Sequence, residues 1–337
     1  MPDDQGPRLE LPRRAVWAAP ATVLVLVGAL AVGVRVLGAS GDQPVNRSAP
    51  VVTTAPTSSA TVRPGRELGK HHHHVGPALR PVKVHRDPSC PIVPPHILRV
   101  LQLNIHAGIG RTGAVDLPQI AAEIRAADPD VVSLNEVDSG TARSGGTDEA
   151  SYLGRATGLH AVYGPNLRRY DGGRFGNAIL SRYPVVASHN LRLPRAFRSE
   201  PRGLLSATLR IGGRTVTFSS LHLSQGHRGL PNRIRQAEAV AGVLRDASDP
   251  TIVAGDLNSR PADLPVRILR QYLLDAQDQG GTGAGNTVPE TAPRSRFDYV
   301  LYDNHFAPVA GSTQVLPSSS DHRGVLTELV LRPRGQC

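Results

Sequence analysis

The stretch that most constrains the fold is the run from Thr251 to Asn258, Thr-Ile-Val-Ala-Gly-Asp-Leu-Asn. The apolar residues at its start predict a buried strand, and Gly255 permits a tight bend or a close approach of the backbone to a ligand. Asp256 and Asn258 then lie at the carboxyl edge of a strand, where open layered folds keep their chemistry. Gly-Asp-x-Asn also makes an ordinary turn, so the interpretation depends on the other strand ends of the chain.

Several other predicted strands also carry a polar side chain at or next to one of their ends. These strands and their polar residues are 97–104 with Asn104, 130–136 with Glu136, 215–221 with His222 and 297–302 with Asp298. Apolar residues at helical spacing predict helices over 117–127, beginning beside Asp116 as an N-cap, and over 233–244. Strands linked by amphipathic helices are typical of a layered α/β protein.

Further strands are predicted over 175–182, 204–211 and 324–331, and Ser320-Asp321-His322 precedes the last of them. Gly212-Gly213 predicts a two-residue hairpin turn after the second. Strands therefore outnumber helices in the predicted domain. The chain has no internal repeat of fixed period, although two similar β-rich halves are compatible with the pattern.

Length and charge exclude some classes of protein. A chain of 337 residues with 39% hydrophobic residues can bury a sizeable core and is not disordered as a whole. Eleven of the 38 Lys and Arg residues and six of the 28 Asp and Glu residues precede residue 98, so each part carries a net +5. That charge is compatible with an anionic substrate but falls short of the basic surface of a nucleic-acid-binding domain.

Residues 1–39 contain the most apolar stretch of the chain. Residues 15–34 carry no charge and follow Arg13-Arg14, which predicts a transmembrane anchor or a signal peptide. Gly38-Ala39-Ser40 is a weak match to a cleavage site, so we favour an uncleaved anchor. The positive-inside rule then leaves the N-terminus in the cytoplasm and the rest of the chain outside the cell membrane, whereas a cleaved leader would make the protein secreted.

Residues 40–96 are rich in Pro, Ser, Thr, Val and Ala without periodicity, which predicts a disordered linker before a folded domain over 97–337. The run His71–His74 could bind a soft divalent metal, but we favour a solvated linker segment. Cys90 and Cys337 flank the domain. Outside the cytoplasm such a pair predicts a disulfide that ties the two ends together, with two free thiols as the alternative.

The polar residues at the strand ends form a chemically coherent set. Carboxylates and amides are hard oxygen ligands for Mg²⁺, a carboxylate or an imidazole can act as a base for water, and further donors can stabilise a charged transition state. These are the groups that hydrolysis of a phosphate ester needs. Each of them alone is more often a turn or cap residue, so the order and spacing carry the interpretation.

The sequence resembles the endonuclease/exonuclease/phosphatase superfamily from about Arg99 to Leu331. The pairing of Gly255-Asp256-Leu257-Asn258 with Ser320-Asp321-His322 carries the resemblance. This superfamily contains pancreatic deoxyribonuclease, AP endonucleases, neutral sphingomyelinases and inositol polyphosphate phosphatases. The resemblance implies an α/β four-layer sandwich, in which two mixed β-sheets pack face to face with helices outside.

The resemblance also implies roles for residues at matching positions. Glu136 looks like the principal metal ligand, assisted by Asn104 and Asp321, with Mg²⁺ as the metal and Mn²⁺ as the alternative. Asp256 resembles the carboxylate that orients or activates the attacking water. Asn258 resembles the amide that holds the phosphate.

Two histidines complete the implied site. His322 resembles the essential histidine, held in its tautomer by the Asp298 carboxylate. His222 resembles a second histidine that either contacts the phosphate or donates a proton to the leaving group. His106 stands where AP endonucleases carry an Asp, so the resemblance does not extend to a second carboxylate-bound metal.

The branch that the sequence looks closest to is a group of bacterial metal-dependent hydrolases. It shares Asn-Ile-His-x-Gly, here 104–108, and Gly-Asn-Ala-Ile-Leu-Ser-Arg, here 176–182. That group also resembles the C-terminal domain of a eukaryotic protein implicated in GPI-anchor lipid remodelling. The resemblance therefore fixes the chemistry better than the substrate.

From these observations we expect an extracytoplasmic, Mg²⁺-dependent phosphoesterase that cleaves a lipid headgroup or GPI-like phosphodiester. We expect it to be a monomer held at the membrane by its N-terminal helix, without a protein partner. A surface or secreted nuclease is the first alternative, with Arg168, Arg169 and Arg174 as its candidate basic groove. A catalytically inactive envelope binding module is the second.

Overall fold

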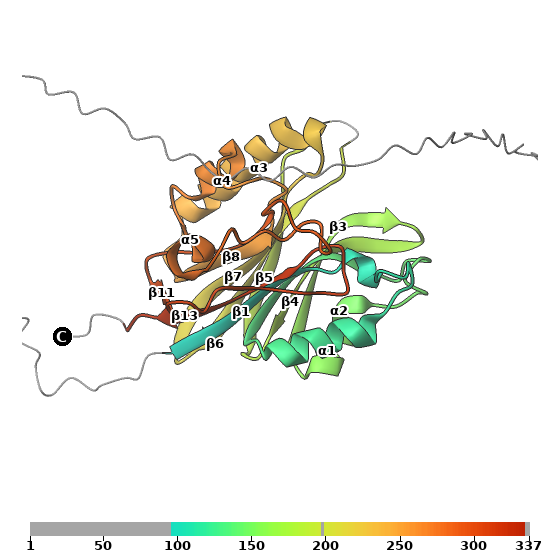
Figure 1. The fold of residues 1–337 in the computed structure, drawn as a ribbon, viewed down its shortest axis with the longest axis horizontal. Coiled ribbons are helices and arrows are strands. Elements are labelled where there is room, and N and C mark those ends of the chain that lie inside the picture. The colour runs from blue at the N-terminus through green and yellow to red at the C-terminus, as the bar shows by residue number, and fades with distance from the viewer. Residues whose placement is uncertain (1–95, 197–198, 334–337) are drawn as a thin grey trace, which may run out of the picture. The chain divides into compact units, whose positions relative to one another are not determined.

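Three separate hydrophobic cores define the layers of the fold. The computed structural model describes residues 96–196 and 199–333. One core lies between two β-sheets, a second packs two helices against the outer face of the first sheet, and a third packs two helices against the outer face of the other. The resulting order of helix, sheet, sheet and helix confirms the predicted four-layer sandwich of two mixed β-sheets (Figure 1).

The first sheet contains both ends of the described chain. Its seven strands are β1 (His96–Asn104), β2 (Val131–Ser139), β3 (His160–Tyr170), β4 (Gly173–Ser181), β11 (Phe306–Pro308), β12 (Gln314–Leu316) and β13 (Gly324–Leu331). They lie in the order β11-β13-β1-β2-β4-β3, with β12 also paired to β13. Only β1 and β2 run parallel, joined by α1 (Leu117–Ala127), and α2 (Glu149–Thr157) packs in the same helical layer.

The second sheet is formed by the middle of the chain. Its six strands are β5 (Val185–Arg192), β6 (Gly203–Ile211), β7 (Arg214–His222), β8 (Thr251–Asp256), β9 (Leu274–Asp275) and β10 (Asp298–Tyr302). They lie in the order β5-β6-β7-β8-β10-β9, and only β7 and β8 run parallel. Helix α3 (Leu230–Arg245) joins these two, α4 (Leu264–Leu269) packs beside it, and α5 (Ala276–Gly280) follows β9.

The two sheets share one topology. Four neighbouring strands, β13-β1-β2-β4 in one sheet and β6-β7-β8-β10 in the other, pair antiparallel, parallel and antiparallel in that order. A helix makes the parallel crossover in each. The two β-rich halves that the sequence left open are therefore alike in topology. Because the carboxyl ends of parallel neighbours lie at the same edge, the register pairs Asn104 with Asn135 and His222 with Asp256.

Local sequence signals explain several of these elements. The Asp116 carboxylate accepts a hydrogen bond from the Gln119 N–H at 3.0 Å, so the predicted N-cap of α1 is confirmed. Gly212 and Gly213 both have positive φ, as a two-residue hairpin between β6 and β7 requires. Gly255 allows a close approach of the backbone to a neighbouring strand, because a Cβ there would collide with the Leu221 carbonyl oxygen.

Other elements were not predicted. Helix α2 and strands β3 and β5 lie in segments whose apolar residues follow no clear period, as do the short elements α4, α5, β9, β11 and β12. Strand β3 contains Pro165 and consecutive arginines, and its register with β4 shifts twice, so its alternation is interrupted. The predicted strands and helices are all present, with ends that differ by at most a few residues.

Several predictions concern residues outside the described part of the chain. They are the N-terminal anchor, the linker over 40–96 except its last residue, His96, which begins β1, the His71–His74 run and the disulfide between Cys90 and Cys337. Among the helices that are described, none combines the length and the apolar character needed to cross a membrane.

A buried glutamate makes stability depend on pH. The Glu149 side chain is fully buried, its Oε2 accepts the Asp138 N–H at 2.7 Å, and burial raises its pKa from 4.5 to about 8. The folded protein therefore keeps the Glu149 proton between these pKa values, where the unfolded chain has lost it. Because the folded state then binds more protons, this group lowers stability as pH rises through that window.

Glu149→Gln removes this titration and keeps an oxygen acceptor for the Asp138 N–H. We expect the variant to gain stability relative to the wild type as pH is raised from about 5 to about 8, by up to a few kcal/mol at about 1.4 kcal/mol per pKa unit. Urea unfolding at a series of pH values measures the difference. Glu238→Gln, which alters an exposed side chain of α3, is the control. A constant difference between the Glu149 variant and the wild type at every pH would contradict the prediction.

Candidate active site

The polar strand ends of the two sheets meet at one edge of the sandwich. Asn104, at the end of β1, donates through Nδ2 to Glu136 Oε1 at 3.2 Å and to Asp256 Oδ2 at 3.2 Å. The first of these bonds lies within one sheet and the second joins the two sheets. Residues more than 100 positions apart in the sequence are thus brought into one polar cluster.

A network of buried amides underlies this cluster. Asn135 Oδ1 accepts the Gln102 Nε2–H at 2.8 Å and the Asp256 backbone N–H at 2.9 Å. Its Nδ2 lies 3.3 Å from the carbonyl oxygen of Leu221 in β7. Both amide side chains are fully buried. Asn135 and Gln102 were not predicted as site residues, although a polar side chain on a strand buried on both faces is a usable signal.

Glu136 lies at a backbone irregularity. The pairing of β2 with β4 shifts between Leu134 and Val137, and Glu136 within that bulge has a φ of 58°. A left-handed backbone is unfavourable for a non-glycine residue and marks functional sites when the surroundings enforce it. The bulge re-aims the side chain, so that Glu136 Oε1 lies 3.2 Å from Asn104 Nδ2 and 4.0 Å from His222 Nε2.

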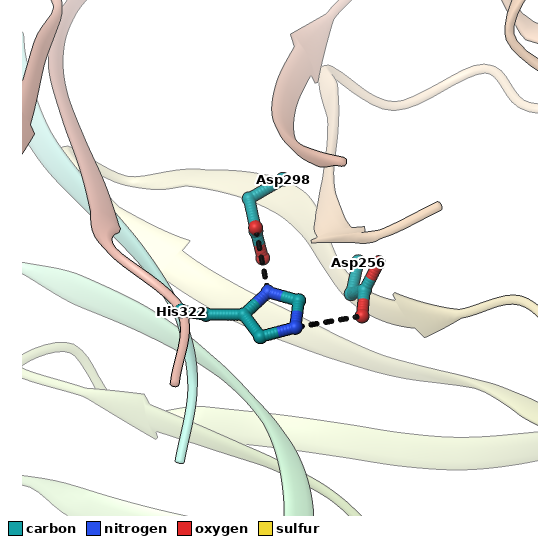
Figure 2. A group of neighbouring side chains, drawn as sticks. All are labelled: Asp256, Asp298 and His322. Atoms are coloured by element: carbon teal, nitrogen blue, oxygen red, sulfur yellow. Dashed lines mark hydrogen bonds and ion pairs between the residues drawn. The ribbon is translucent and has the colours of Figure 1, made fainter. Parts of the chain in front are cut away.

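Asp298, His322 and Asp256 form a line of contacts, with the His322 ring between the two carboxylates (Figure 2). His322 Nδ1 is 2.9 Å from Asp298 Oδ2, and its Nε2 is 3.8 Å from Asp256 Oδ2. Gln102 Nε2 donates to the other Asp298 oxygen at 3.3 Å. The predicted pairing of His322 with Asp298 is present, and the same imidazole also faces Asp256.

The charges of this line shift the pKa values of its members. Burial lowers the pKa of His322, but the nearby Asp298, Asp256 and Asp321 carboxylates outweigh it and raise the pKa to about 10. Burial also raises the pKa of Asp256 to about 7, against the opposing effect of His322. At neutral pH the imidazolium is therefore a hydrogen-bond donor, and Asp256 is the group whose proton affinity suits a general base.

Asn258 and His222 lie on the other side of Asp256. Asn258, with a φ of 46°, donates its backbone N–H to Asp256 Oδ1 at 2.8 Å. Its Nδ2 donates to the Leu223 carbonyl at 3.1 Å and lies 3.2 Å from His222 Nε2. His222 Nε2 is 3.6 Å from Asp256 Oδ2. Burial, then the charges of Arg202 and His322, hold the pKa of His222 well below its usual value.

Asp321 lies at the rim of the cluster. Its side chain is 58% exposed, and its Oδ1 is 3.9 Å from Nδ1 of His106. His106 donates its backbone N–H to Asn104 Oδ1 at 3.1 Å. Among the hydrogen bonds and ion pairs of the described residues, none joins Asp321 directly to Glu136 or Asn104.

The donor set suits a divalent cation. The carboxylates of Glu136 and Asp256 converge on one Nδ2 of Asn104, and convergent oxygen donors are what a hard cation such as Mg²⁺ requires. Asp256, Asp298 and His322 also offer buried ligand atoms that lie within 4.8 Å of one another. His322 Nδ1 is already paired with Asp298, however, which favours the Glu136 carboxylate as the first ligand. Asn104 could join it only through Oδ1, because the Nδ2 that faces the carboxylates is a donor.

Comparison with known proteins agrees with this geometry. The sequence model of the Endonuclease/Exonuclease/phosphatase family matches residues 101–322. The uncharacterized protein YbhP of Escherichia coli is 29% identical over 250 residues, covering 69% of this chain and 96% of YbhP. Protein cwh43 of Schizosaccharomyces pombe is 27% identical over 166 residues, which are 49% of this chain and 17% of cwh43.

Solved structures share the fold. An endonuclease/exonuclease/phosphatase from Beutenbergia cavernae superposes with a TM-score of 0.60 at 27% identity, covering 70% of this chain and 72% of that one. A family protein from Bacteroides thetaiotaomicron gives a TM-score of 0.59 at 19% identity, covering 72% and 100%. The family match spans the residues from β1 to His322, and with it the whole polar cluster. The chain therefore belongs to the endonuclease/exonuclease/phosphatase family.

Proposed function

We propose that this protein is a divalent-metal-dependent phosphoesterase that acts at the outer side of a membrane. Members of its family are hydrolases that act on phosphate esters. The observation that carries the proposal is the convergence of Glu136, Asp256 and the His322–Asp298 pair on one edge of the sandwich. The location outside the cell rests on the sequence of residues 1–39, namely the arginines that precede its apolar stretch.

Each side chain has a role that its contacts support. Glu136 and Asn104 would hold the cation, with Asp321 as a predicted third ligand, and a Mg²⁺ there would neutralise phosphate charge. Asp256 faces His222 and His322 and, among the described residues, forms no ion pair with a lysine or an arginine. It accepts the proton of the attacking water. His322, charged and fixed by Asp298, donates a hydrogen bond toward the same space. The Asn258 amide holds a phosphate oxygen.

A cavity beside the site offers room for the headgroup of a substrate. It measures about 280 Å³ and adjoins His222, because Arg202 and Ser224 line it. The remaining described lining residues are Ser199, Glu200, Gln225, Arg228, Gly229 and Asn232. None of these described residues is aliphatic or aromatic, and two of the lining residues, Arg202 and Arg228, are arginines, so the cavity can accept a phosphorylated group. We propose that a lipid headgroup phosphodiester is cleaved.

A nuclease is the second candidate, and the β3–β4 hairpin favours it. Arg168, Arg169 and Arg174 are exposed on this hairpin, which extends from the strand beside Glu136. The Arg174 guanidinium also lies 5.7 Å from the centroid of the Tyr163 ring. Basic and aromatic side chains together can bind a nucleic-acid backbone. Three arginines on one hairpin form only a small basic surface for a nucleic acid, which is why we place this function second.

Removing the principal metal ligand tests the chemistry. Glu136→Gln should lower Mg²⁺-dependent hydrolysis of bis(p-nitrophenyl) phosphate by about 100-fold or more, since it removes a charged ligand of a hard cation. Its thermal unfolding should change little. Glu238→Gln, on the exposed face of α3, should keep wild-type activity. If the wild-type protein kept its full activity in excess EDTA, the proposed metal-dependent mechanism would be contradicted.

The His322–Asp298 pair should behave as one unit. We expect His322→Gln and Asp298→Asn each to lower kcat by about 100-fold or more, and the double variant to lose little beyond the stronger single variant. The reason is that Asp298 acts by fixing and charging the imidazole. Single-turnover rates of the four proteins measure the coupling. Independent effects that multiply in the double variant would contradict the pairing.

The substrate class is tested by direct comparison. We expect kcat/KM on phospholipid in mixed micelles to exceed kcat/KM on duplex and single-stranded DNA at the same Mg²⁺ and salt concentrations. Salt must be matched because nucleic-acid binding depends steeply on it. A clear preference for DNA at physiological salt would make the protein a surface nuclease. In that case the Arg168→Gln, Arg169→Gln double variant should weaken DNA binding and flatten its salt dependence.

A further inference from the structure

The two histidines of the site have partners of opposite charge. His322 Nδ1 lies 2.9 Å from the Asp298 carboxylate, whereas His222 Nδ1 lies 3.2 Å from Nη1 of Arg202. Arg202 is 1% exposed and is among the largest fully buried side chains of the described structure. A buried arginine is rare unless it is paired, and this one pairs with Glu200 Oε1 at 2.6 Å.

The hydrogen-bonding capacity of arginine fixes the state of His222. A guanidinium has five N–H donors and no acceptor, and it does not lose its proton in proteins. The His222 Nδ1 that faces it must therefore be the acceptor, without a proton of its own. A neutral imidazole carries one proton, so that proton is on Nε2. The opposite tautomer would point an N–H at a buried cation.

We infer that Arg202 is a positioning residue, which holds His222 in the tautomer with Nε2–H and so makes it a donor to a phosphate oxygen. The sequence left two roles open for His222, phosphate contact and proton donation to the leaving group. The Nε2–H tautomer selects phosphate contact. The role toward substrate rests on the proposed function, while the tautomer itself does not.

The surroundings of Nε2 contain two acceptors for its proton and one competing donor. Asp256 Oδ2 lies 3.6 Å away and Glu136 Oε1 lies 4.0 Å away, and both are acceptors. Asn258 Nδ2, whose orientation is fixed by its bond to the Leu223 carbonyl, lies within hydrogen-bond distance at 3.2 Å and can only donate, but a neutral amide competes weakly with the charged Arg202 donor at Nδ1. Two N–H donors, one from each side chain, thus lie side by side. Such a pair can share one oxygen of an anion, as donors in an oxyanion hole do.

The two histidines then have different roles in the site. Asp298 pairs with the His322 ring, whereas burial first and Arg202 second lower the pKa of His222, although both rings face Asp256. Two identical side chains with oppositely charged partners are a known way of giving one site both a charged and a neutral donor. The leaving-group proton must therefore come from a group other than His222.

Nitrogen NMR of the full-length protein, labelled with ¹⁵N at histidine and kept in EDTA, tests the tautomer directly. The resonances of His222 are identified by their loss in His222→Gln. We expect a single neutral tautomer with the proton on Nε2. Exchanging the pair in the Arg202→Glu, Glu200→Arg double variant should move the proton to Nδ1, because a carboxylate only accepts. A wild-type ring protonated on Nδ1, or on both nitrogens at neutral pH, would overturn the inference.

Arg233→Met is the matched control. Arg233 is another buried arginine of this region, 7% exposed, but it donates to the Ser224 and Gly226 carbonyls and not to His222. Arg202→Met should disturb the tautomer and Arg233→Met should not. A disturbance of equal size in both variants, or in neither, would assign Arg202 a merely structural role. The wild-type spectrum remains decisive if Arg202→Met does not fold.

Kinetic measurements test the catalytic role of Arg202 separately from the tautomer of His222. Arg202→Met should lower kcat for bis(p-nitrophenyl) phosphate by about 10-fold to 100-fold, the usual cost of removing an orienting partner, and Arg202→Lys should recover part of it. An unchanged kcat together with a lost tautomer would overturn the catalytic part. If the wild type hydrolyses no phosphodiester at all, the proposed function fails, yet the NMR result still decides the tautomer.

Discussion

The Asn135 amide connects the two sheets at the point where the site forms. One side chain accepts from Gln102 in its own sheet and from the Asp256 backbone in the other, and donates toward β7. These bonds fix the ends of β2, β7 and β8 relative to one another in a buried, low-dielectric environment, where an unsatisfied amide would be costly. The bonds of Asn135 therefore set the distances between the carboxylates and imidazoles at these strand ends.

The shared topology of the sheets explains why the site is composite. Each sheet has one parallel pair, and the carboxyl ends of that pair provide one polar cluster. Packing the sheets face to face brings the two clusters together, so that Asn104 of one sheet bonds Asp256 of the other. Neither sheet alone holds the metal ligands, the base and the histidines. Assembly of the core between the sheets is therefore also assembly of the site.

The fold and the clustering of most candidate residues could be predicted from the sequence, because strand ends and caps are local signals. Gly255, Asp256 and the Asp116 cap are examples. The direction of Glu136 could not be predicted, since a bulge breaks the two-residue alternation on which such predictions depend. Arg202 was missed because it lies in an irregular segment before β6, and its contact with His222 depends on the pairing of β6 with β7.

The bulge at Glu136 has a consequence for the evolution of this chain. The left-handed backbone there favours glycine, and every other side chain makes it less stable. Natural proteins tolerate such losses where activity requires them, and stabilising substitutions at such positions commonly remove function. Position 136 is thus a point of conflict between stability and activity: a descendant freed from selection for hydrolysis would gain stability by acquiring glycine there. A glutamate at this position in a relative would indicate continued selection for the chemistry.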